Sequence, residues 1–208
     1  MATGTKRRIL QHAAAVASTE GLERATVGRL ADDLGMSKAG LYGHFGSKEQ
    51  LQLDTIAFGR EVFQEQVVAP ANRAPAGLPR LWALCTAYLS YVDAAVFPGG
   101  DLFVTVANEF DTRTGVIHEE IADVIAGWMR TLENLVDEAV TLGHLTACDA
   151  EQVAFEIEAL LVAGNHMRHL DDDPRALLRA RVGIARRLEE LRTPTTPLLT
   201  EHDHTGTP

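Results

Sequence analysis

The feature that most constrains the fold is a helical period of apolar residues, which recurs through nearly the whole chain. It is clearest in one long stripe: Ile117, Ile121, Val124, Ile125, Trp128, Leu132, Leu135, Val136, Ala139 and Leu142. Gly143 follows this stripe at the position where a helix C-cap is expected. No segment keeps the alternation of apolar and polar residues that is typical of a half-buried strand. The sequence therefore predicts an all-α protein of about nine helices.

Glycine, proline and capping residues mark where these helices begin and end. The expected helices span 6–20, 27–34, 38–45, 48–68, 80–96, 101–110, 117–142, 149–169 and 174–192. Ser47 begins a capping-box pattern that opens the fourth helix, and Asp173 followed by Pro174 is expected to open the last one. Residues 70–79 hold three prolines and are predicted to be a loop.

Net charge divides the chain into two unequal parts. The formal charge of −10 over 208 residues argues, taken whole, against a nucleic-acid binder, because phosphate contacts need Lys and Arg. Residues 1–50, however, carry +2, whereas the remaining residues carry −12. This asymmetry indicates that the N-terminal segment meets a polyanion, although an excess this small also arises by chance.

Three short helices in the first 45 residues, the second and third joined by a glycine turn, are typical of a helix-turn-helix unit. In the third, Leu41 and Phe45 are spaced to anchor the helix to the core. Gly40 and Gly43 each cost about 1 kcal/mol relative to alanine, a cost that close approach of the backbone to a DNA groove would explain. Lys48 lies in the first turn of the next helix, where a cation is unfavourable unless a phosphate binds there. The alternative is a glycine-tolerant surface helix with an incidental lysine.

The run from Thr26 to Leu51, TVGRLADDLGMSKAGLYGHFGSKEQL, closely resembles the DNA-binding signature of the tetracycline-repressor (TetR) family of bacterial regulators. Its most specific part is Leu41-Tyr42-x-His44-Phe45-x-Ser47-Lys48-x-x-Leu51. The resemblance covers about the first 50 residues by motif. It implies a helix-turn-helix domain in residues 1–50 and an effector-binding and dimerisation domain in residues 51–192. Residues 193–208, rich in Thr and Pro, are predicted to be a disordered tail.

The resemblance also assigns roles by position. The residues expected to contact the DNA backbone or its phosphates are Thr26, Ser37, Tyr42, His44 and Lys48. The residues at positions where the family touches base edges are Lys38, Ala39, Gly40 and Gly43. Only Lys38 among these four has a side chain that can hydrogen-bond a base, so DNA shape is expected to carry much of the specificity. Arg7 and Arg8 are expected to reach neighbouring phosphates or a minor groove.

The family resemblance implies a homodimer that binds double-stranded operator DNA of near-palindromic sequence. The last two expected helices, 149–169 and 174–192, are the predicted dimerisation pair; the alternative is that their apolar faces pack within one subunit. Ligand binding is expected to act through the fourth helix, which links the two domains.

The middle helices hold most of the aromatic residues and a few polar groups, which together suggest a cavity. The candidate effector-pocket residues are Phe58, Trp82, Tyr88, Phe103, Phe110, His118, Trp128, Asn165 and His166. Such a cavity would accept a small hydrophobic effector, neutral or cationic. Ordinary core packing is the alternative for each aromatic residue taken singly.

Enzyme motifs are incomplete in this sequence. His118-Glu119-Glu120-Ile121 begins like a zinc-protease helix, but Ala122 stands where the second histidine is needed. His166 and His169 near three aspartates suggest a metal site or, alternatively, a solvated helix end. We therefore predict no enzymatic activity, no metal and no cofactor.

Two cysteines far apart, with no leader pattern and no run of roughly 18 apolar residues, predict a cytoplasmic protein without membrane association. The function expected is a ligand-responsive transcriptional regulator, by default a repressor that the effector releases from DNA. The alternative is a helical small-molecule-binding or interaction protein without specific DNA binding.

Overall fold

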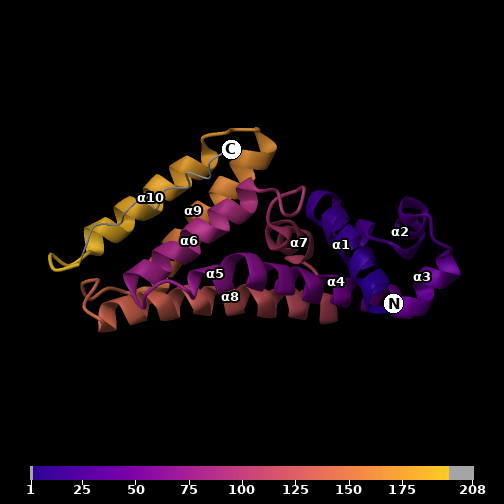
Figure 1. Ribbon diagram of the computed structural model, residues 1–208, viewed down its shortest axis with the longest axis horizontal. Helices are drawn as coiled ribbons and strands as arrows, with labels where there is room; N and C mark the ends of the chain where they lie inside the picture. Colours follow the sequence, from indigo (N-terminus) through magenta and orange to yellow (C-terminus); the bar gives the residue numbers. More distant parts are fainter. Residues whose placement is uncertain (1, 197–208) are drawn as a thin grey trace.

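The computed structural model describes residues 2–196 and confirms the all-α prediction (Figure 1). Its α-helices are α1 (Ala2–Glu20), α2 (Val27–Leu34), α3 (Lys38–Phe45), α4 (Lys48–Phe63), α5 (Ala69–Ala71), α6 (Leu78–Asp93), α7 (Leu102–Phe110), α8 (Val116–Thr141), α9 (Ala150–Leu170) and α10 (Ala176–Leu191). A 3-10 turn, η1 (Leu22–Arg24), follows α1. A π-helical stretch, η2 (Gln64–Val68), joins α4 to α5 without a break, so the three form one helical run.

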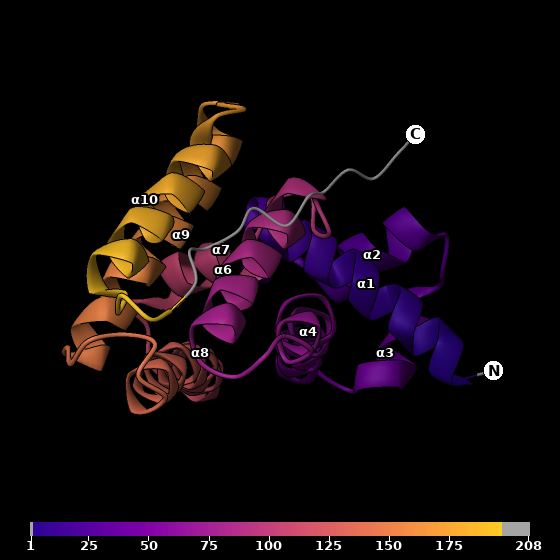
Figure 2. The same ribbon diagram turned by 60° about the vertical axis from the view of Figure 1, so that its left-hand side comes forward.

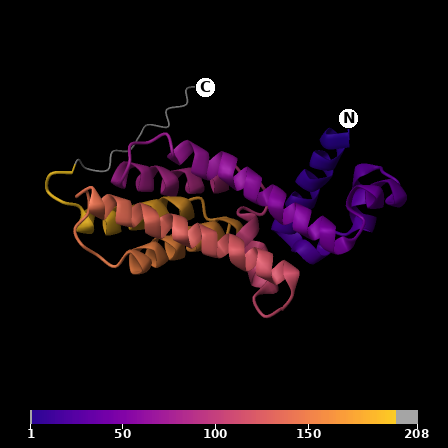
Figure 3. The same ribbon diagram turned by 90° about the horizontal axis from the view of Figure 1, so that it is seen from below.

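The helices form two parts along the long axis of the molecule. Helices α1–α3 with η1 form a head at one end, and α6–α10 form a body at the other (Figure 1). Helix α4 leads from the head along the body beside α8 (Figure 3). Helices α9 and α10 lie side by side at the end farthest from α3 (Figure 2). Helix α4 therefore contacts both the head, through α1, and the body, through α8.

Capping side chains fix the starts of several helices where the sequence predicts them. The hydroxyl of Ser47 accepts a hydrogen bond from the Gln50 N–H at 3.0 Å, which confirms the expected start of α4. Ser37 and Asp149 cap α3 and α9 in the same way. Each of these side chains satisfies a backbone N–H that has no partner within its helix.

Several predicted boundaries are wrong. The predicted loop 70–79 is shorter than expected, because α5 includes Pro70 and Ala71 and α6 begins at Leu78. Helix α1 begins at Ala2, four residues earlier than expected. Helix α6 spans Leu78–Asp93 instead of 80–96. It begins before Pro79, because proline is tolerated in the first turn of a helix, where its missing N–H is not needed. Helix α10 begins at Ala176, since the Asp173 carboxylate accepts the Arg175 N–H and closes a turn before the helix starts.

The first four residues of the predicted disordered tail, 193–196, are part of the described structure. Residues 193–196 form a turn in which the Thr193 hydroxyl donates to the carbonyl of Gly143 at 2.8 Å and the Thr193 N–H donates to the carbonyl of His144. The rest of the predicted tail, 197–208, lies outside the described residues. Within 2–196, no helix is long and apolar enough to span a membrane.

The loop before α7 and α7 itself hold the head against the body at Ser18. The Gly99 N–H donates to the Ser18 hydroxyl at 3.1 Å, and the Thr105 hydroxyl donates to the Ser18 carbonyl at 3.0 Å. A Cβ on Gly99 would lie 1.9 Å from that carbonyl oxygen. Because no side chain fits there, glycine is required for α1 to approach this loop.

Candidate DNA interface and effector cavity

Helix α3 presents most of the residues predicted to contact DNA. Leu41 and Phe45 are buried and hold the helix on the head, as their spacing predicts. Tyr42 is 51% exposed. The remaining exposed positions of this helix are Lys38, Ala39, Gly40 and Gly43, and His44 is half-buried beside the ring of Phe45. The structure therefore places the predicted reading residues together on one eight-residue helix.

The two glycines of α3 have different surroundings. A Cβ on Gly40 would lie 3.0 Å from the Ser37 hydroxyl, so Gly40 is explained by the capping interaction at the start of the helix. A Cβ on Gly43 would meet nothing within 4 Å. Packing within the head therefore does not require glycine at position 43, and close approach of another molecule remains a reason for it.

Lys48 is held by a carboxylate of the head. Its ammonium donates to Glu23 of η1, and the Gln52 amide donates to the same carboxylate at 2.9 Å. Arg113 of the body lies 3.7 Å from it. These interactions, that with Lys48 foremost, lower the pKa of the Glu23 carboxyl. A phosphate that binds Lys48 would have to share it with Glu23.

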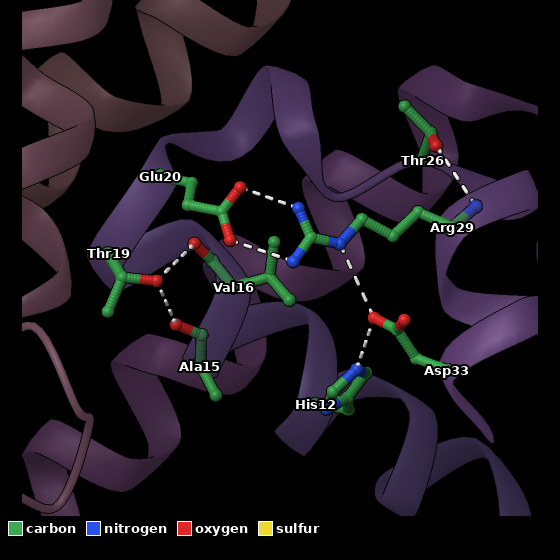
Figure 4. A network of polar contacts seen from close by, with 8 residues as sticks. All are labelled: His12, Ala15, Val16, Thr19, Glu20, Thr26, Arg29 and Asp33. Carbon is green, nitrogen blue, oxygen red and sulfur yellow. Dashed lines mark hydrogen bonds and ion pairs between the residues drawn. The ribbon is translucent and has the colours of Figure 1, made fainter.

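A charged network fixes α2 against α1 (Figure 4). The Arg29 guanidinium donates to both oxygens of Glu20 at 2.5 and 2.7 Å and to Asp33 at 3.4 Å. The His12 ring lies 2.9 Å from the same Asp33 oxygen. The bonds from Arg29 and His12 lower the pKa of the Glu20 and Asp33 carboxyls respectively. Thr26 begins α2 by accepting the Arg29 N–H at 3.3 Å.

The Arg7 side chain contacts helix α4. Its guanidinium lies 3.5 Å from Glu61 of α4 and 5.2 Å from the centre of the Phe58 ring. Because α4 supplies Arg7 with a carboxylate and an aromatic face, Arg7 would have to leave Glu61 to reach DNA, and its contact with DNA stays a prediction. Arg8 is exposed.

Glu109, at the end of α7, binds the head directly. Its carboxylate accepts the N–H groups of Leu22 and Glu23 at 2.5 and 3.1 Å. Gly21 precedes this turn with φ of 92°, and a Cβ there would lie 2.7 Å from the carboxylate. Nothing in the local pattern around Glu109 identifies this long-range partner, so sequence reasoning missed it. The contact joins α7 to the turn that holds Lys48 through Glu23.

A cavity of about 650 Å³ lies between α4, α7, α8 and α9. Its lining residues are Arg60, Phe63, Gln64, Val68, Asp101, Phe103, Val104, Ala107, Asn108, Asp123, Val124, Ile125, Gly127, Trp128, Arg130, Thr131, Glu158 and Val162. Phe103 and Trp128 are the two members of the predicted pocket set among them. A volume of this size suits a drug-sized ligand.

The other seven predicted pocket residues do not line this cavity. Tyr88 lies behind it, with its ring stacked on Trp128 at a centroid distance of 6.0 Å. Asn165 is buried and accepts the Asp101 N–H at 3.0 Å. Among the rest, three aromatic residues are buried in the core: Phe58, Trp82 and Phe110. The His118 ring is hydrogen-bonded to the Phe110 carbonyl, and His166 is exposed at the surface.

Two carboxylates in the cavity wall were missed by sequence reasoning. Asp101 is 5% exposed; it caps α7 by accepting the Phe103 N–H and also accepts the Tyr88 hydroxyl at 3.1 Å. Burial raises the pKa of Asp101 to about 6. Glu158 accepts the Trp128 indole N–H at 2.6 Å, and burial raises its pKa as well. The sequence marks Asp101 as a helix start but gives no sign that it faces a cavity.

Two family models match the chain. Residues 9–54 match the bacterial regulatory proteins of the tetR family, and residues 77–184 match the tetracyclin repressor-like C-terminal domain. The chain belongs to the TetR family. The resemblance drawn from the motif is thereby confirmed, and residues 9–54 form the helix-turn-helix DNA-binding region of a TetR-family transcriptional regulator.

Solved structures share this TetR fold at low sequence identity. A TetR transcriptional regulator from Chloroflexus aurantiacus has a TM-score of 0.84 and 23% identity, over 92% of this chain and 97% of its own. AibR in complex with isovaleryl coenzyme A and operator DNA has a TM-score of 0.69 and 23% identity, over 90% and 97%. A transcriptional regulator from Saccharomonospora viridis, described in complex with choline, has a TM-score of 0.76 and 20% identity, over 90% and 96%. No curated protein sequence matches the chain significantly.

The sequence left two interpretations of His166 and His169 open: a metal site or a solvated helix end. Across residues 2–196 of this TetR-family chain, the structure contains no group of three or more His, Cys, Asp or Glu side chains arranged to hold a metal ion.

The buried Asp101 gives a prediction about stability and pH. Its pKa is about 6 in the folded chain and near its ordinary value of 3.8 when unfolded, so the folded state binds the proton more tightly. The free energy of unfolding therefore falls as the pH rises through this window. Asp101→Asn keeps the cap acceptor without the buried charge and should raise the free energy of unfolding at pH 7 by about 2 kcal/mol.

Urea denaturation at pH 7 and pH 4 measures this effect. The gain from Asp101→Asn should disappear at pH 4, where the wild-type carboxyl is largely protonated. Asp149→Asn, at the exposed cap of α9, is the matched control and should give no gain at either pH. A less stable Asp101→Asn variant at pH 7 would contradict the assignment.

Proposed function

We propose that this chain is a ligand-responsive repressor that binds a near-palindromic operator as a homodimer and releases it when a small effector occupies the cavity. The observation that carries the proposal is the exposed helix α3, which bears the family signature and is joined through α4 to a body that encloses a ligand-sized cavity. We place the domain division near residue 50, where the family signature ends and α4 has just begun.

In this proposal, α3 enters the major groove of the operator. Tyr42, His44 and Lys48 contact the DNA backbone, with Thr26 and Ser37 at the helix starts nearby. Lys38 reads a base edge, while Ala39, Gly40 and Gly43 let the helix approach closely. Lys38 extends over Gly28 of α2, with its ammonium 3.8 Å from where a Cβ on that glycine would lie, and must swing away to reach a base.

Similar folds bind different small molecules. AibR is described with isovaleryl coenzyme A and operator DNA, and the Saccharomonospora viridis regulator is described with choline. One ligand is a large anion and the other a small cation, so these relatives support an effector for the cavity without fixing its class.

Tyr42→Ala tests the DNA interface. Because Tyr42 is 51% exposed, its removal should leave the melting temperature nearly unchanged. The loss of one backbone contact should weaken operator binding about tenfold. Gel-shift titration over a series of salt concentrations, with DNA from upstream of the gene, measures this affinity.

Leu142→Ala is the control, since Leu142 is 49% exposed but lies at the end of α8, outside the head. Unchanged affinity of Tyr42→Ala would remove Tyr42 from the interface. If the wild-type protein forms no salt-sensitive specific complex, the alternative of a helical binding protein without specific DNA recognition is favoured.

An exposed apolar face on α9 and α10 supports dimerisation. Its large members are Phe155, Met167, Leu170, Leu178 and Val182, which are between 40% and 69% exposed. Ala159 and Ala163 continue the spacing of four residues from Phe155 to Met167, and both are exposed. Exposed apolar residues that gather on two neighbouring helices are typical of an interface. A second copy would bury it in a four-helix bundle.

Phe155→Glu tests this interface. A charge within a two-fold contact is repeated on both copies and leaves buried carboxylates without partners, so the dimer should dissociate into monomers. Light scattering after size exclusion measures the mass, and operator affinity should fall together with it. Leu142→Glu, which adds the same charge away from this face, should remain dimeric. A dimeric Phe155→Glu variant would place the interface elsewhere.

We propose that the effector acts on the head through two routes. The first is α4, which lines the cavity at Arg60 and Phe63 and begins with Lys48. The second is α7, which lines the same cavity and whose last turn holds Glu109, the acceptor of the η1 N–H groups. A ligand that shifts α7 would therefore also shift Glu23 and the lysine that it holds.

Glu109→Gln tests the second route. An amide accepts only one of the two N–H bonds, and its own NH₂ group meets the other N–H, so η1 should separate from α7. Operator affinity should then fall several-fold although Glu109 lies outside α3. Fluorescence anisotropy with labelled operator measures this change, with exposed Glu119→Gln on α8 as the control. Equal affinities for the two variants would exclude this route.

A further inference from the structure

The inner wall of the cavity carries two carboxylates without a cationic partner. Asp101 comes from the start of α7 and Glu158 from the middle of α9. Their hydrogen bonds come from neutral donors: the Tyr88 hydroxyl and the Phe103 N–H to Asp101, and the Trp128 indole to Glu158. Across the part of the chain that the structure describes, no Lys, Arg or His forms an ion pair with either carboxylate. Asp101 is buried and Glu158 is half-buried. Charges removed from water are ordinarily paired, so this wall is unusual.

The two carboxylates belong to one polar unit. Tyr88 donates to Asp101, Trp128 donates to Glu158, and the rings of the two donors are stacked on each other. Phe63 packs edge-on against Trp128 at a centroid distance of 5.1 Å. The unit therefore combines two negative charges with aromatic surface, and both suit a positively charged ligand.

Burial makes the ionised form of this unit costly. The pKa of Asp101 rises to about 6, and desolvation together with the charge of Asp101 raises the pKa of Glu158. A cation placed near both groups would remove the repulsion between them and offset their desolvation.

We propose that the effector cavity takes an organic cation, an amine or quaternary ammonium with an apolar body, and that its charged end lies against Asp101 and Glu158. This inference rests on the proposed function, because it names the ligand class of the same cavity. The apolar body would lie along Phe63, Phe103 and Val124, which line the cavity.

The arginines of the cavity give the main rival interpretation. Arg60 and Arg130 also line it, and an anionic ligand would use them. Both are exposed, and Arg60 lies 3.9 Å from Glu120. Solvent screens exposed charges more strongly than buried ones, so the inner carboxylates are expected to dominate the selectivity.

Three probes with one shared phenylbutyl body separate these ligand classes: phenylbutyltrimethylammonium, phenylbutanol and phenylpentanoate. Isothermal titration calorimetry of the full-length protein at neutral pH measures their affinities. The cation should bind at least about tenfold more tightly than the alcohol, and the carboxylate most weakly. Failure of the cation to bind at millimolar concentration, or equal or tighter binding of either other probe, overturns the inference.

Glu158→Gln locates the cation in the cavity. It keeps an acceptor for the Trp128 indole and should weaken binding of the cation about tenfold, with little effect on the alcohol. Glu151→Gln, on the exposed first turn of the same helix, should bind the cation like the wild type. Melting temperatures establish that each variant is folded. If a folded Glu158→Gln variant binds the cation as tightly as the wild type does, the proposed site is wrong.

Operator binding distinguishes this inference from the proposed function. Phenylbutyltrimethylammonium should weaken the operator complex of the wild-type protein and leave that of Glu158→Gln largely intact at the same concentration. A specific operator complex without preference for the cation would overturn the ligand class alone. The absence of any specific operator complex would instead overturn the proposed function, while the calorimetric preference could still stand.

Discussion

The position of the head depends on α7, because a carboxylate fixes each end of this nine-residue helix. At its start, Asp101 caps the helix from within the cavity wall. At its end, Glu109 accepts two N–H groups of η1 in the head. A helix of this length spans about 13 Å, so the cavity and the head are joined by one rigid element. A ligand that contacts Asp101 thus acts on the same helix whose other end holds the head.

The sequence predicts the fold and the reading helix because both depend on local patterns. The spacing of Leu41 and Phe45, the cap at Ser47 and the stripe along α8 each follow from periodicity or capping within one element. The predicted start of a helix was wrong where two local signals compete. Pro174 is compatible with a helix start, but the turn closed by Asp173 delays α10 until Ala176.

The cavity could not be predicted in the same way, because its walls come from four helices far apart in the sequence. The pocket prediction, which relied on aromatic residues, included Trp82 and Phe110, and both are buried in the core. Asp101 and Glu158 carry no local sign of their surroundings, since only the packing of α7 and α9 removes them from water. Composition therefore identified residue types suited to a pocket, whereas tertiary packing decides which of them face it.

Two cations, one in α2 and one at the start of α4, form ion pairs with carboxylates of the head. Arg29 and Lys48 are paired with Glu20 and Glu23, so a DNA phosphate that bound either cation would compete with a carboxylate of the chain itself. If Lys48 moves to a phosphate, the Glu23 carboxylate still accepts the hydrogen bond from Gln52. Without Lys48 beside it, it would attract Arg113 of the body more strongly. DNA binding would then change the contact between head and body on which α7 also acts. Linkage between two binding sites is reciprocal, so if an effector that shifts α7 lowers DNA affinity, DNA must lower affinity for the effector by the same factor.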